Sequence, residues 1–185
     1  MRLVCKRSRI SGAVSVPGSK SHTIRAVAVA AMAKGRSTLR SPLLSEDTVS
    51  AAGAATVFGA KVGRSDDDTV WSIDGVGGRL LRPVSTVDMG NSGTSLRIFT
   101  GIAALADFPA SFDGDESLRT RPMESLLKAL GMLGGKCSSA GGKCPLSVQG
   151  PMLGGKARIE GKSSQFVTGI LFAAQVGRAS CRGRW

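Results

Sequence analysis

The sequence has no tyrosine, and aromatic residues make up only 4% of its 185 residues. Few side chains are therefore available for stacking on bases, so the composition does not favour a binder of single-stranded nucleic acid. Hydrophobic residues still amount to 42%, which indicates a folded domain. Its core must be built from Ala, Val, Leu, Ile and Met, with close backbone contacts at many of the 25 glycines.

Long apolar runs are also missing. The longest, Ala26–Ala33 and Gly101–Ala106, are too short for a membrane-spanning helix, which needs about 20 residues. Residues 1–12 are basic but contain no apolar segment, so no secretory signal is predicted. We expect a cytoplasmic protein that makes no membrane contact.

Residues that bind metals are few. Cys5, Cys137, Cys144 and Cys181 form no CxxC pair, and His22 is the only histidine. This pattern supports neither a metal site nor a disulfide framework, so we interpret the cysteines as small apolar side chains or incidental surface thiols. His22 has no neighbouring Asp or Ser with which to form a triad, and we interpret it as a polar residue of a helix cap region.

Charge of one sign is abundant, since the formal net charge is +12. A basic chain can bind nucleic acid, an anionic membrane surface or small anionic substrates. Here the basic residues are dispersed, and several lie beside Gly and Ser in predicted loops. This arrangement favours small phosphorylated or carboxylated ligands, and general nucleic-acid binding is the weakest alternative.

The chain contains an internal repeat. Residues Gly18–Arg25 can be laid over Gly90–Arg97 at an offset of 72 positions (90 − 18), and a third copy starts 71 positions later at Gly161 (161 − 90). Each copy enters an apolar segment with helical spacing. The strands predicted before the three copies are Ala13–Val16, Ser85–Asp88 and Ala157–Glu160.

The predicted unit is strand, Gly/Ser loop, helix, strand, helix, strand, strand, which gives an α/β fold of repeated βαβαββ units. In the first unit, the spacing of apolar residues from Ile24 to Met32 predicts a helix that starts after Ser19 or Ser21 and ends at Gly35. Its second helix is expected from near Asp47 to Gly59. We divide the chain into an N-terminal segment 1–11, a binding domain 12–176 with units 12–82, 83–152 and an incomplete third unit 153–176, and an atypical tail 177–185.

In the second unit, the second helix is expected to start near Pro122 and end at Gly134-Gly135. A Glu124–Lys128 pair at i, i+4 spacing supports this helix. Hairpins are predicted where two strands flank a turn, namely Lys61–Gly63 with Val70–Ile73 and Lys136–Ser138 with Leu146–Gln149.

The repeated loops are predicted to bind anions. Backbone N–H groups at a helix N-terminus lack partners, and the helix dipole there favours negative charge. Three such loops at one end of a domain would form a site for a polyanion. A single such loop is more often an ordinary helix cap, and Arg119 and Arg121 are either solvated or able to grip a carboxylate or phosphate.

Four motifs together resemble a known family. PGSKSxxxR, GNSGTSLR, RTRP and SSQF occur in the order and approximate spacing of the EPSP synthase family, between Ser11 and Ala174. The related UDP-N-acetylglucosamine enolpyruvyl transferases are the alternative, but their first motif typically has Lys-Asn where this chain has Lys20-Ser21. The resemblance implies an enolpyruvyl-transferase-like domain, an inside-out α/β barrel, as one of two similar domains of three βαβαββ units each.

The same resemblance implies the activity. The family transfers the enolpyruvyl group of phosphoenolpyruvate to shikimate 3-phosphate and releases phosphate, a step towards the aromatic amino acids that uses no organic cofactor or catalytic metal. By motif matching, Lys20 is expected to touch both substrates, and Ser21 and Arg25 to hold shikimate 3-phosphate. The remaining expected binding residues are Asn91, Gly93 and Arg121 for phosphoenolpyruvate, Ser163 and Ser164 for the 3-phosphate, and Gln165 between the substrates.

Two features of the sequence depart from the family pattern. The catalytic acid and base of the family come from its second domain, beyond residue 185, so no catalytic residue is assigned here. We expect the isolated chain to need a second domain or complementary fragment, and a binding module without catalysis is the alternative.

Ser92 stands where many relatives have Ala, which leaves sensitivity to glyphosate, a competitor of phosphoenolpyruvate, open. The basic tail after Gln175 suggests a truncation, a frameshift or a vector-derived end.

Overall fold

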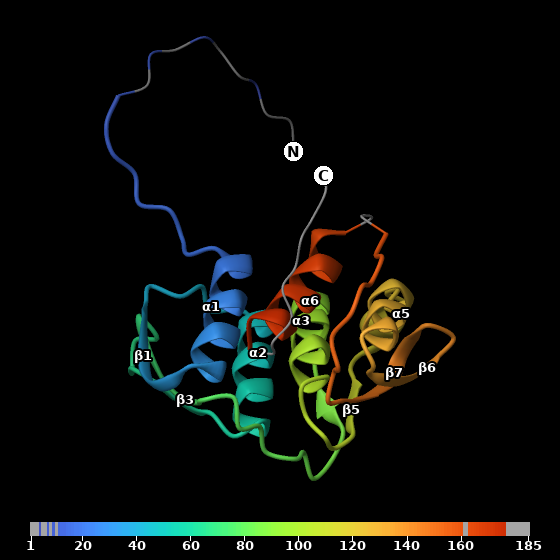
Figure 1. Cartoon of the computed structure of the whole chain (residues 1–185). Coiled ribbons are helices and arrows are strands. Elements are labelled where there is room, and N and C mark those ends of the chain that lie inside the picture. The colour runs from blue at the N-terminus through green and yellow to red at the C-terminus, as the bar shows by residue number, and fades with distance from the viewer. Residues whose placement is uncertain (1–3, 5–6, 8, 10, 161–162, 177–185) are drawn as a thin grey trace.

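The computed structural model describes residues 4, 7, 9, 11–160 and 163–176. The helices are α1 (Lys20–Met32), α2 (Glu46–Val57), α3 (Gly93–Ala103), α4 (Glu116–Arg119), α5 (Glu124–Met132) and α6 (Ser164–Val176). The strands are β1 (Lys34–Arg40), β2 (Lys61–Arg64), β3 (Val70–Val76), β4 (Val87–Asp88), β5 (Ala110–Asp113), β6 (Lys136–Ala140) and β7 (Lys143–Gln149). Figure 1 shows these elements in their arrangement.

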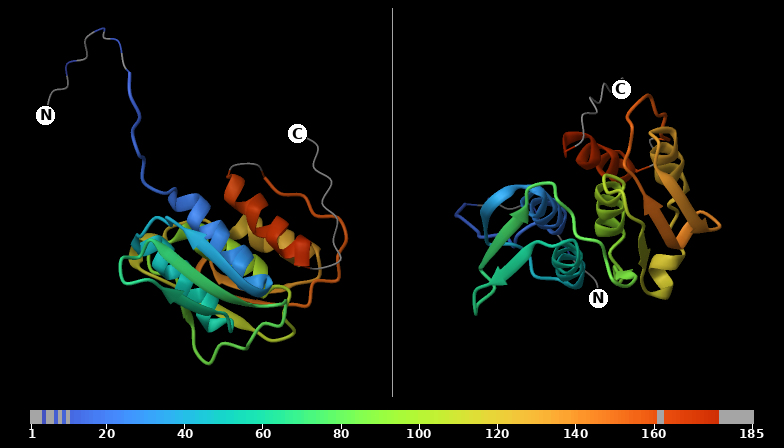
Figure 2. Two further views of the ribbon diagram at one scale, coloured as in Figure 1. Left: turned by 90° about the vertical axis from the view of Figure 1, so that its left-hand side faces the viewer. Right: turned by 60° about the horizontal axis from the view of Figure 1, so that its bottom comes forward.

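Two sheets lie on the outside of the domain, with the helices packed between them (Figures 1 and 2). The first sheet has the strand order β1-β3-β2 and is antiparallel throughout. The second has the order β4-β5-β7-β6, in which only the β4–β5 pair is parallel. Helices α1 and α2 pack against the first sheet, and α3 and α5 against the second. This arrangement confirms the predicted α/β class.

Helix α3 is the centre of the structure. All of its residues are buried, and it packs against α1, α2 and α6. It is a core helix although it also carries the polar residues Ser95, Arg97 and Thr100, which are buried with it. Phe58, at the end of α2, and Phe99 of α3 stack with ring centroids 6.2 Å apart, and Phe112 of β5 lies 6.1 Å from Phe58, so these rings join α2, α3 and the second sheet.

The start of α1 confirms one of the two predicted caps, but its end differs from the prediction. Ser19 is the N-cap, and its side chain accepts a hydrogen bond from the His22 N–H at 3.4 Å. The helix ends at Met32, and Gly35 lies inside β1 with φ of +88°. Gly35 therefore does not end the helix, because the chain has already turned into the ladder that β1 forms with β3.

The predicted hairpins and second helices are present. Val62 pairs with Ile73 in the first sheet, and Cys137 pairs with Val148 in the second. Glu124 and Lys128 form the expected ion pair, at 2.7 Å. The glycines expected to end α2 and α5, at positions 59 and 134, have φ of +103° and +99°, which is the left-handed conformation typical of a helix end.

The strand predicted at Ala13–Val16 is absent. In the second sheet, the Met89 N–H donates to the Asp113 carbonyl at 2.9 Å and continues the β4–β5 pairing. The residue at the equivalent repeat position is Pro17 (89 − 72), which has no N–H to donate. Residues 11–17 are instead exposed and lead away from the body, as the blue trace in Figure 1 shows.

The strand predicted at Ala157–Glu160 is also absent, since these residues form no ladder. Strand β4 is paired with β5, the strand that follows α3 in the chain. No strand follows α6 within the described residues, so the segment has no equivalent partner there. A strand pattern in a sequence becomes a strand only where a neighbouring edge offers hydrogen bonds.

Candidate functional site

The predicted loops meet at one end of the domain. Lys20, at the start of α1, contacts Asp47, at the start of α2, and Asp47 is in turn joined to Ser95 in the first turn of α3. The third loop reaches the same place, because Gln165 at the start of α6 contacts Arg97 of α3. We call the nine predicted residues the loop cluster: Lys20, Ser21, Arg25, Asn91, Gly93, Arg121, Ser163, Ser164 and Gln165.

The first loop presents two cations. The Lys20 ammonium lies 3.0 Å from the Asp47 carboxylate, and about half of its side chain surface, 48%, is exposed. The Arg25 guanidinium donates to the Ser21 carbonyl at 3.0 Å and to the Thr168 hydroxyl of α6 at 3.4 Å. Arg25 thus connects the first loop to the third, while the Ser21 side chain remains exposed.

The second loop is closely packed around a glycine. A Cβ atom at Gly93 would lie 2.8 Å from Arg97 Nη1 and 2.9 Å from Arg121 Nη1. Two guanidinium groups therefore flank the N-terminus of α3, where backbone N–H groups and the helix dipole favour an anion. Arg121 also donates to the exposed Asn91 side chain. Only glycine leaves space for this arrangement.

The third loop offers hydroxyls and an amide. The Ser163 side chain accepts from the Gln165 N–H at 3.2 Å, and Ser164 is exposed. The Gln165 side-chain oxygen accepts from Arg97 Nη1 at 2.7 Å. The structure therefore brings all three loops together.

Arg97 belongs to this site but was missing from the predicted set. It is only 7% exposed and donates to the carbonyls of Gly93 and Pro122 at 3.0 Å each, besides Gln165. Its guanidinium lies 5.0 Å from the centroid of the Phe166 ring. Burial, together with the nearby charge of Arg121, lowers the pKa of Arg97. The repeat provided one signal, because Arg97 aligns with the predicted residue Arg25.

Asp47 was predicted only as a helix start. Its carboxylate contacts Lys20, one of four cations of the site, and the other three are Arg25, Arg97 and Arg121. A carboxylate is common in the first turn of a helix, so its proximity to Lys20 could not be inferred from position alone. The excess of positive charge fits a ligand with more than one negative charge.

Two other candidates do not join the loop cluster. Arg119 is held by Asp113 through two bonds of 2.7 and 3.0 Å, so its guanidinium already has a carboxylate partner. This contact raises the pKa of Arg119 and lowers that of Asp113. His22 is exposed on α1, as expected for a polar residue of the cap region.

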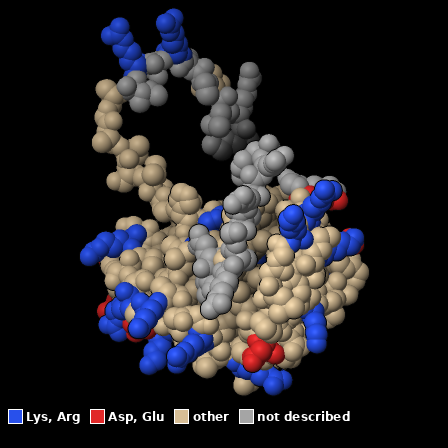
Figure 3. Space-filling view, viewed as in Figure 1, with Lys and Arg blue, Asp and Glu red and all other residues tan. Residues whose placement is uncertain are grey.

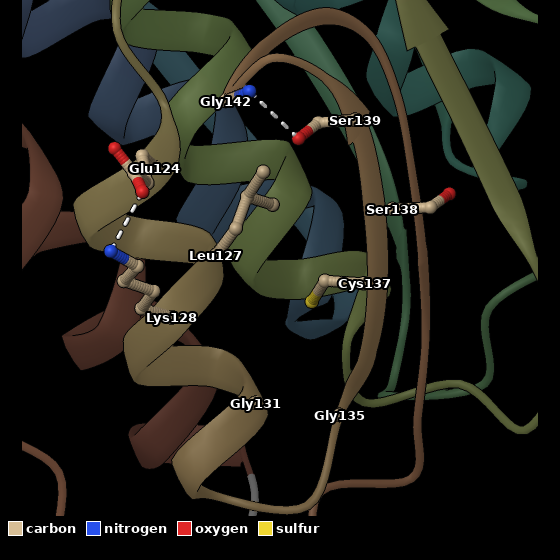
Figure 4. A pocket seen from close by; sticks show the side chains of 9 residues that line it. All are labelled: Glu124, Leu127, Lys128, Gly131, Gly135, Cys137, Ser138, Ser139 and Gly142. Atoms are coloured by element: carbon tan, nitrogen blue, oxygen red, sulfur yellow. Dashed lines mark hydrogen bonds and ion pairs between the residues drawn. The ribbon is translucent and has the colours of Figure 1, made fainter.

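Two hollows lie near α5. One of about 560 Å³ is lined by Arg97, Ser163 and Phe166 and also by four charged residues, namely Glu124, Lys128, Arg158 and Glu160. A second, of about 380 Å³, lies between α5 and the β6–β7 hairpin (Figure 4). Cys137 and Ser139 line only this second hollow, whereas Glu124 lines both.

Three further observations concern surface charge, metal binding and membrane spans. Lys and Arg side chains are scattered over the face shown in Figure 3 rather than gathered into one patch. Within the described ranges, no group of three or more His, Cys, Asp or Glu residues is placed to hold a metal ion. None of the helices described here is both long enough and apolar enough to cross a membrane.

Several known proteins with similar sequences carry the same name. The 3-phosphoshikimate 1-carboxyvinyltransferase of Methanocorpusculum labreanum is 44% identical over 186 residues, which cover 98% of this chain and 43% of the relative. That of Methanothermobacter thermautotrophicus is 45% identical over 172 residues, or 91% of this chain and 40% of the relative. The chain thus spans about two fifths of the length of the curated relatives it matches.

A solved structure and a family profile agree with these relatives. EPSP synthase from Acinetobacter baumannii superposes with a TM-score of 0.78 at 31% identity, covering 88% of this chain and 38% of that one. Residues 4–180 match the profile of EPSP synthase (3-phosphoshikimate 1-carboxyvinyltransferase). With nearly its whole length matched, the chain belongs to the EPSP synthase family.

Proposed function

We propose that this chain supplies the substrate-binding loops of an enzyme that transfers the enolpyruvyl group of phosphoenolpyruvate to shikimate 3-phosphate. The observation that carries the proposal is the meeting of three Gly/Ser loops at helix N-termini with four cations around them. Both substrates are polyanions, and helix N-termini with Lys, Arg and hydroxyl donors bind phosphate and carboxylate groups. We place this reaction in the cytoplasm.

Each residue of the loop cluster has a role in this proposal. Lys20 contacts both substrates, because its ammonium is half-exposed between the first two loops. Ser21 and Arg25 hold shikimate 3-phosphate, and their proximity to the third loop supports this role. Ser163 and Ser164 receive its 3-phosphate, and Gln165 lies between the substrates.

Phosphoenolpyruvate is assigned to the second loop. Asn91, Gly93 and Arg121 lie together at the N-terminus of α3, and Arg97 lies directly beneath them. A rigid guanidinium fork can bind a carboxylate or phosphate through two parallel hydrogen bonds. Arg121 is partly exposed and able to do this, whereas Arg97 is buried and already donates to three protein groups.

The proposal includes a division of the chain into units, which the two sheets support. We assign units 12–82 and 83–152, each supported by one sheet, and a third unit 153–176, whose one described helix is α6. Segment 1–11 is assigned to a second domain, which would also supply the catalytic acid and base. Most residues of that segment, and the tail 177–185, lie outside the described residues.

The test is a binding titration together with an activity assay. We expect the 185-residue chain to bind shikimate 3-phosphate in isothermal titration calorimetry, and Lys20→Ala to weaken binding by about tenfold or more, since a hydrogen bond to a charged group is lost. We expect no phosphate release from the two substrates, because binding loops alone provide no proton transfer. A pure binding module would also bind the substrate without catalysis. Adding the second domain as a separate protein distinguishes the two possibilities, because it should restore phosphate release only if the chain is part of the enzyme. A wild-type chain that binds neither substrate would refute the proposal.

A further inference from the structure

The first turn of α2 is held by two buried hydroxyl groups of the α3 loop. Ser92 and Ser95 are both fully buried, and their oxygens lie 2.6 Å apart. The Ser95 hydroxyl donates to the main-chain carbonyl of Asp47 at 3.2 Å. Since a hydroxyl has one proton, the Ser92 hydroxyl must then donate to Ser95. The result is a hydroxyl chain that runs from Ser92 through Ser95 to Asp47.

The same residue, Asp47, faces Lys20 with its side chain. Its Oδ2 lies 3.0 Å from the Lys20 ammonium, and the two side chains are 23% and 48% exposed. Water competes for both groups of such an exposed pair, so the pair alone holds the ammonium weakly. When a hydrogen bond anchors the main chain of Asp47, its carboxylate can occupy fewer positions. It therefore restricts the Lys20 ammonium more strongly than a mobile carboxylate would.

A carboxylate at an anion site needs an explanation. Asp47 repels an incoming phosphate or carboxylate, so its presence would only weaken binding if it had no other effect. Its contact with Lys20 offers such an effect, because it can fix the direction of a flexible side chain before the ligand arrives. Three donors on the ammonium allow it to keep Asp47 while it contacts a ligand.

We infer that Ser95 and Ser92 are positioning residues, which fix the first turn of α2 so that Asp47 directs the Lys20 ammonium towards the loop cluster. The hydroxyl chain thereby couples the second loop to the first. This inference rests on the proposed function, since it describes how Lys20 is presented to the anionic substrates. It concerns side chains that make no contact with substrate themselves.

The variant that tests the inference is Ser95→Ala, and helix α3 provides a matched control. Thr100 is also fully buried on α3, and its hydroxyl has no hydrogen-bond partner in the described part of the chain. Thr100→Val thus removes a buried hydroxyl from the same helix without touching the hydroxyl chain. In calorimetric titrations with shikimate 3-phosphate, we expect Ser95→Ala to weaken binding about 3- to 10-fold, the usual effect of one hydrogen bond, and Thr100→Val to change it by less than about twofold.

A double-mutant cycle separates positioning from a general structural effect. In an Asp47→Asn background, Ser95→Ala should change the affinity by less than about twofold, because the residue through which it acts has already lost its charge. Equal fold-losses in both backgrounds would overturn the inference. If Ser95→Ala fails to fold, Ser92→Ala replaces it in the cycle, with an expected loss of about two- to threefold, because the bond from Ser95 to Asp47 remains.

A second measurement does not depend on the ligand. The Lys20 side-chain ammonium signal, assigned by its loss in Lys20→Arg, is followed by NMR in the free protein. We expect it to shift in Ser95→Ala and in Asp47→Asn but not in Thr100→Val. A wild-type chain that binds no shikimate 3-phosphate, but whose Lys20 signal responds in this way, would refute the proposed function and support the positioning. The other outcome is a wild-type chain that binds shikimate 3-phosphate tightly, while Ser95→Ala changes neither the Lys20 signal nor the affinity. This result would refute the positioning and leave the proposed function standing.

Discussion

Gly101 of α3 lies directly against Gly169 of α6, so close that a methyl group on Gly101 would come within 2.1 Å of the Gly169 carbonyl oxygen. Gly169 has no more room than Gly101, because a methyl group on Gly169 would lie 2.6 Å from the carbonyl oxygen of Arg97, also on α3. The two helices can approach this closely only because neither residue has a side chain. This contact sets the distance between the loops at the N-termini of α3 and α6.

Gly101→Ala should therefore destabilise the protein. The added methyl group meets main-chain atoms, which cannot move without separating the helices, and overpacking of this kind costs about 1–3 kcal/mol or more. The free energy of unfolding from urea denaturation measures the effect. Gly53→Ala on α2 is the control, since Gly53 is exposed and a methyl group added there would have no atom within 4 Å. There we expect a gain of about 0.5–1 kcal/mol from the better helix propensity of Ala. A loss at both positions would contradict the role of the close contact.

Arg97→Lys should also lower stability. The Arg97 guanidinium donates to Gly93, Pro122 and Gln165, and a lysine ammonium cannot reproduce this planar set of bonds. We expect a loss of about 2–4 kcal/mol in the free energy of unfolding, since at least one buried acceptor is left without its partner. Arg36→Lys, in an exposed pair with Asp74, should cost much less. Equal losses in the free energy of unfolding for Arg97→Lys and Arg36→Lys would show that the burial of Arg97 does not matter.

Gly93→Ala should weaken the binding of phosphoenolpyruvate more than that of shikimate 3-phosphate. The atoms nearest to a methyl group at Gly93 are the guanidinium nitrogens of Arg97 and Arg121, and the side chain of Arg121 is partly exposed and can move aside. With Arg121 displaced, we expect the affinity for phosphoenolpyruvate to fall by about tenfold and that for shikimate 3-phosphate by less than about twofold. Titrations with each substrate would test this, and equal losses for both would contradict the assignment of the second loop.

Asp67 should make the β2–β3 turn sensitive to acid. Hydrogen bonds from the Ser65 hydroxyl and from the N–H and hydroxyl of Thr69 lower the pKa of Asp67 to about 2. As the pH falls, the unfolded chain takes up this proton first, near the ordinary pKa of 3.8. The stabilisation is thus complete above about pH 5 and disappears as the pH falls through the folded-state pKa.

Asp67→Asn should accordingly be less stable than the wild type near neutral pH, and the difference should shrink as the pH approaches about 2. Urea denaturation at several pH values would measure it. Asp66→Asn is the control, because Asp66 makes no side-chain hydrogen bond within the described residues. A difference that does not change with pH would exclude titration of Asp67 as its cause.

Much of this fold could be predicted because its signals are local. Ser19 caps α1 through a hydrogen bond three residues away, and the glycines at positions 59 and 134 end helices through their own backbone conformation. The loop cluster could be predicted because the repeat and the family motifs place its residues at equivalent helix starts. The strand predicted at Ala13–Val16 is absent, and Pro17 cannot make the hydrogen bond that Met89 makes at the equivalent position.

The centre of the site was harder to predict. Arg97 becomes buried only when Gln165 and Phe166, far along the chain, pack over it, and nothing in its neighbouring sequence indicates that burial. Asp47 resembled an ordinary acidic residue at a helix start, and its contact with Lys20 follows from how α1 and α2 pack together. The burial of Arg97 and the contact of Asp47 with Lys20 both depend on the distances between helices. Residue types alone do not specify such distances.

The complete burial of α3 also limits how this protein can be redesigned. Residues 94–103 are all buried, so nearly every substitution there disturbs a neighbouring helix or sheet. A library aimed at a new anionic ligand would lose most of its members if it randomised this helix. Variation would be better placed at the exposed positions Ser21, Asn91 and Ser164, which lie beside the same site and have room for larger side chains.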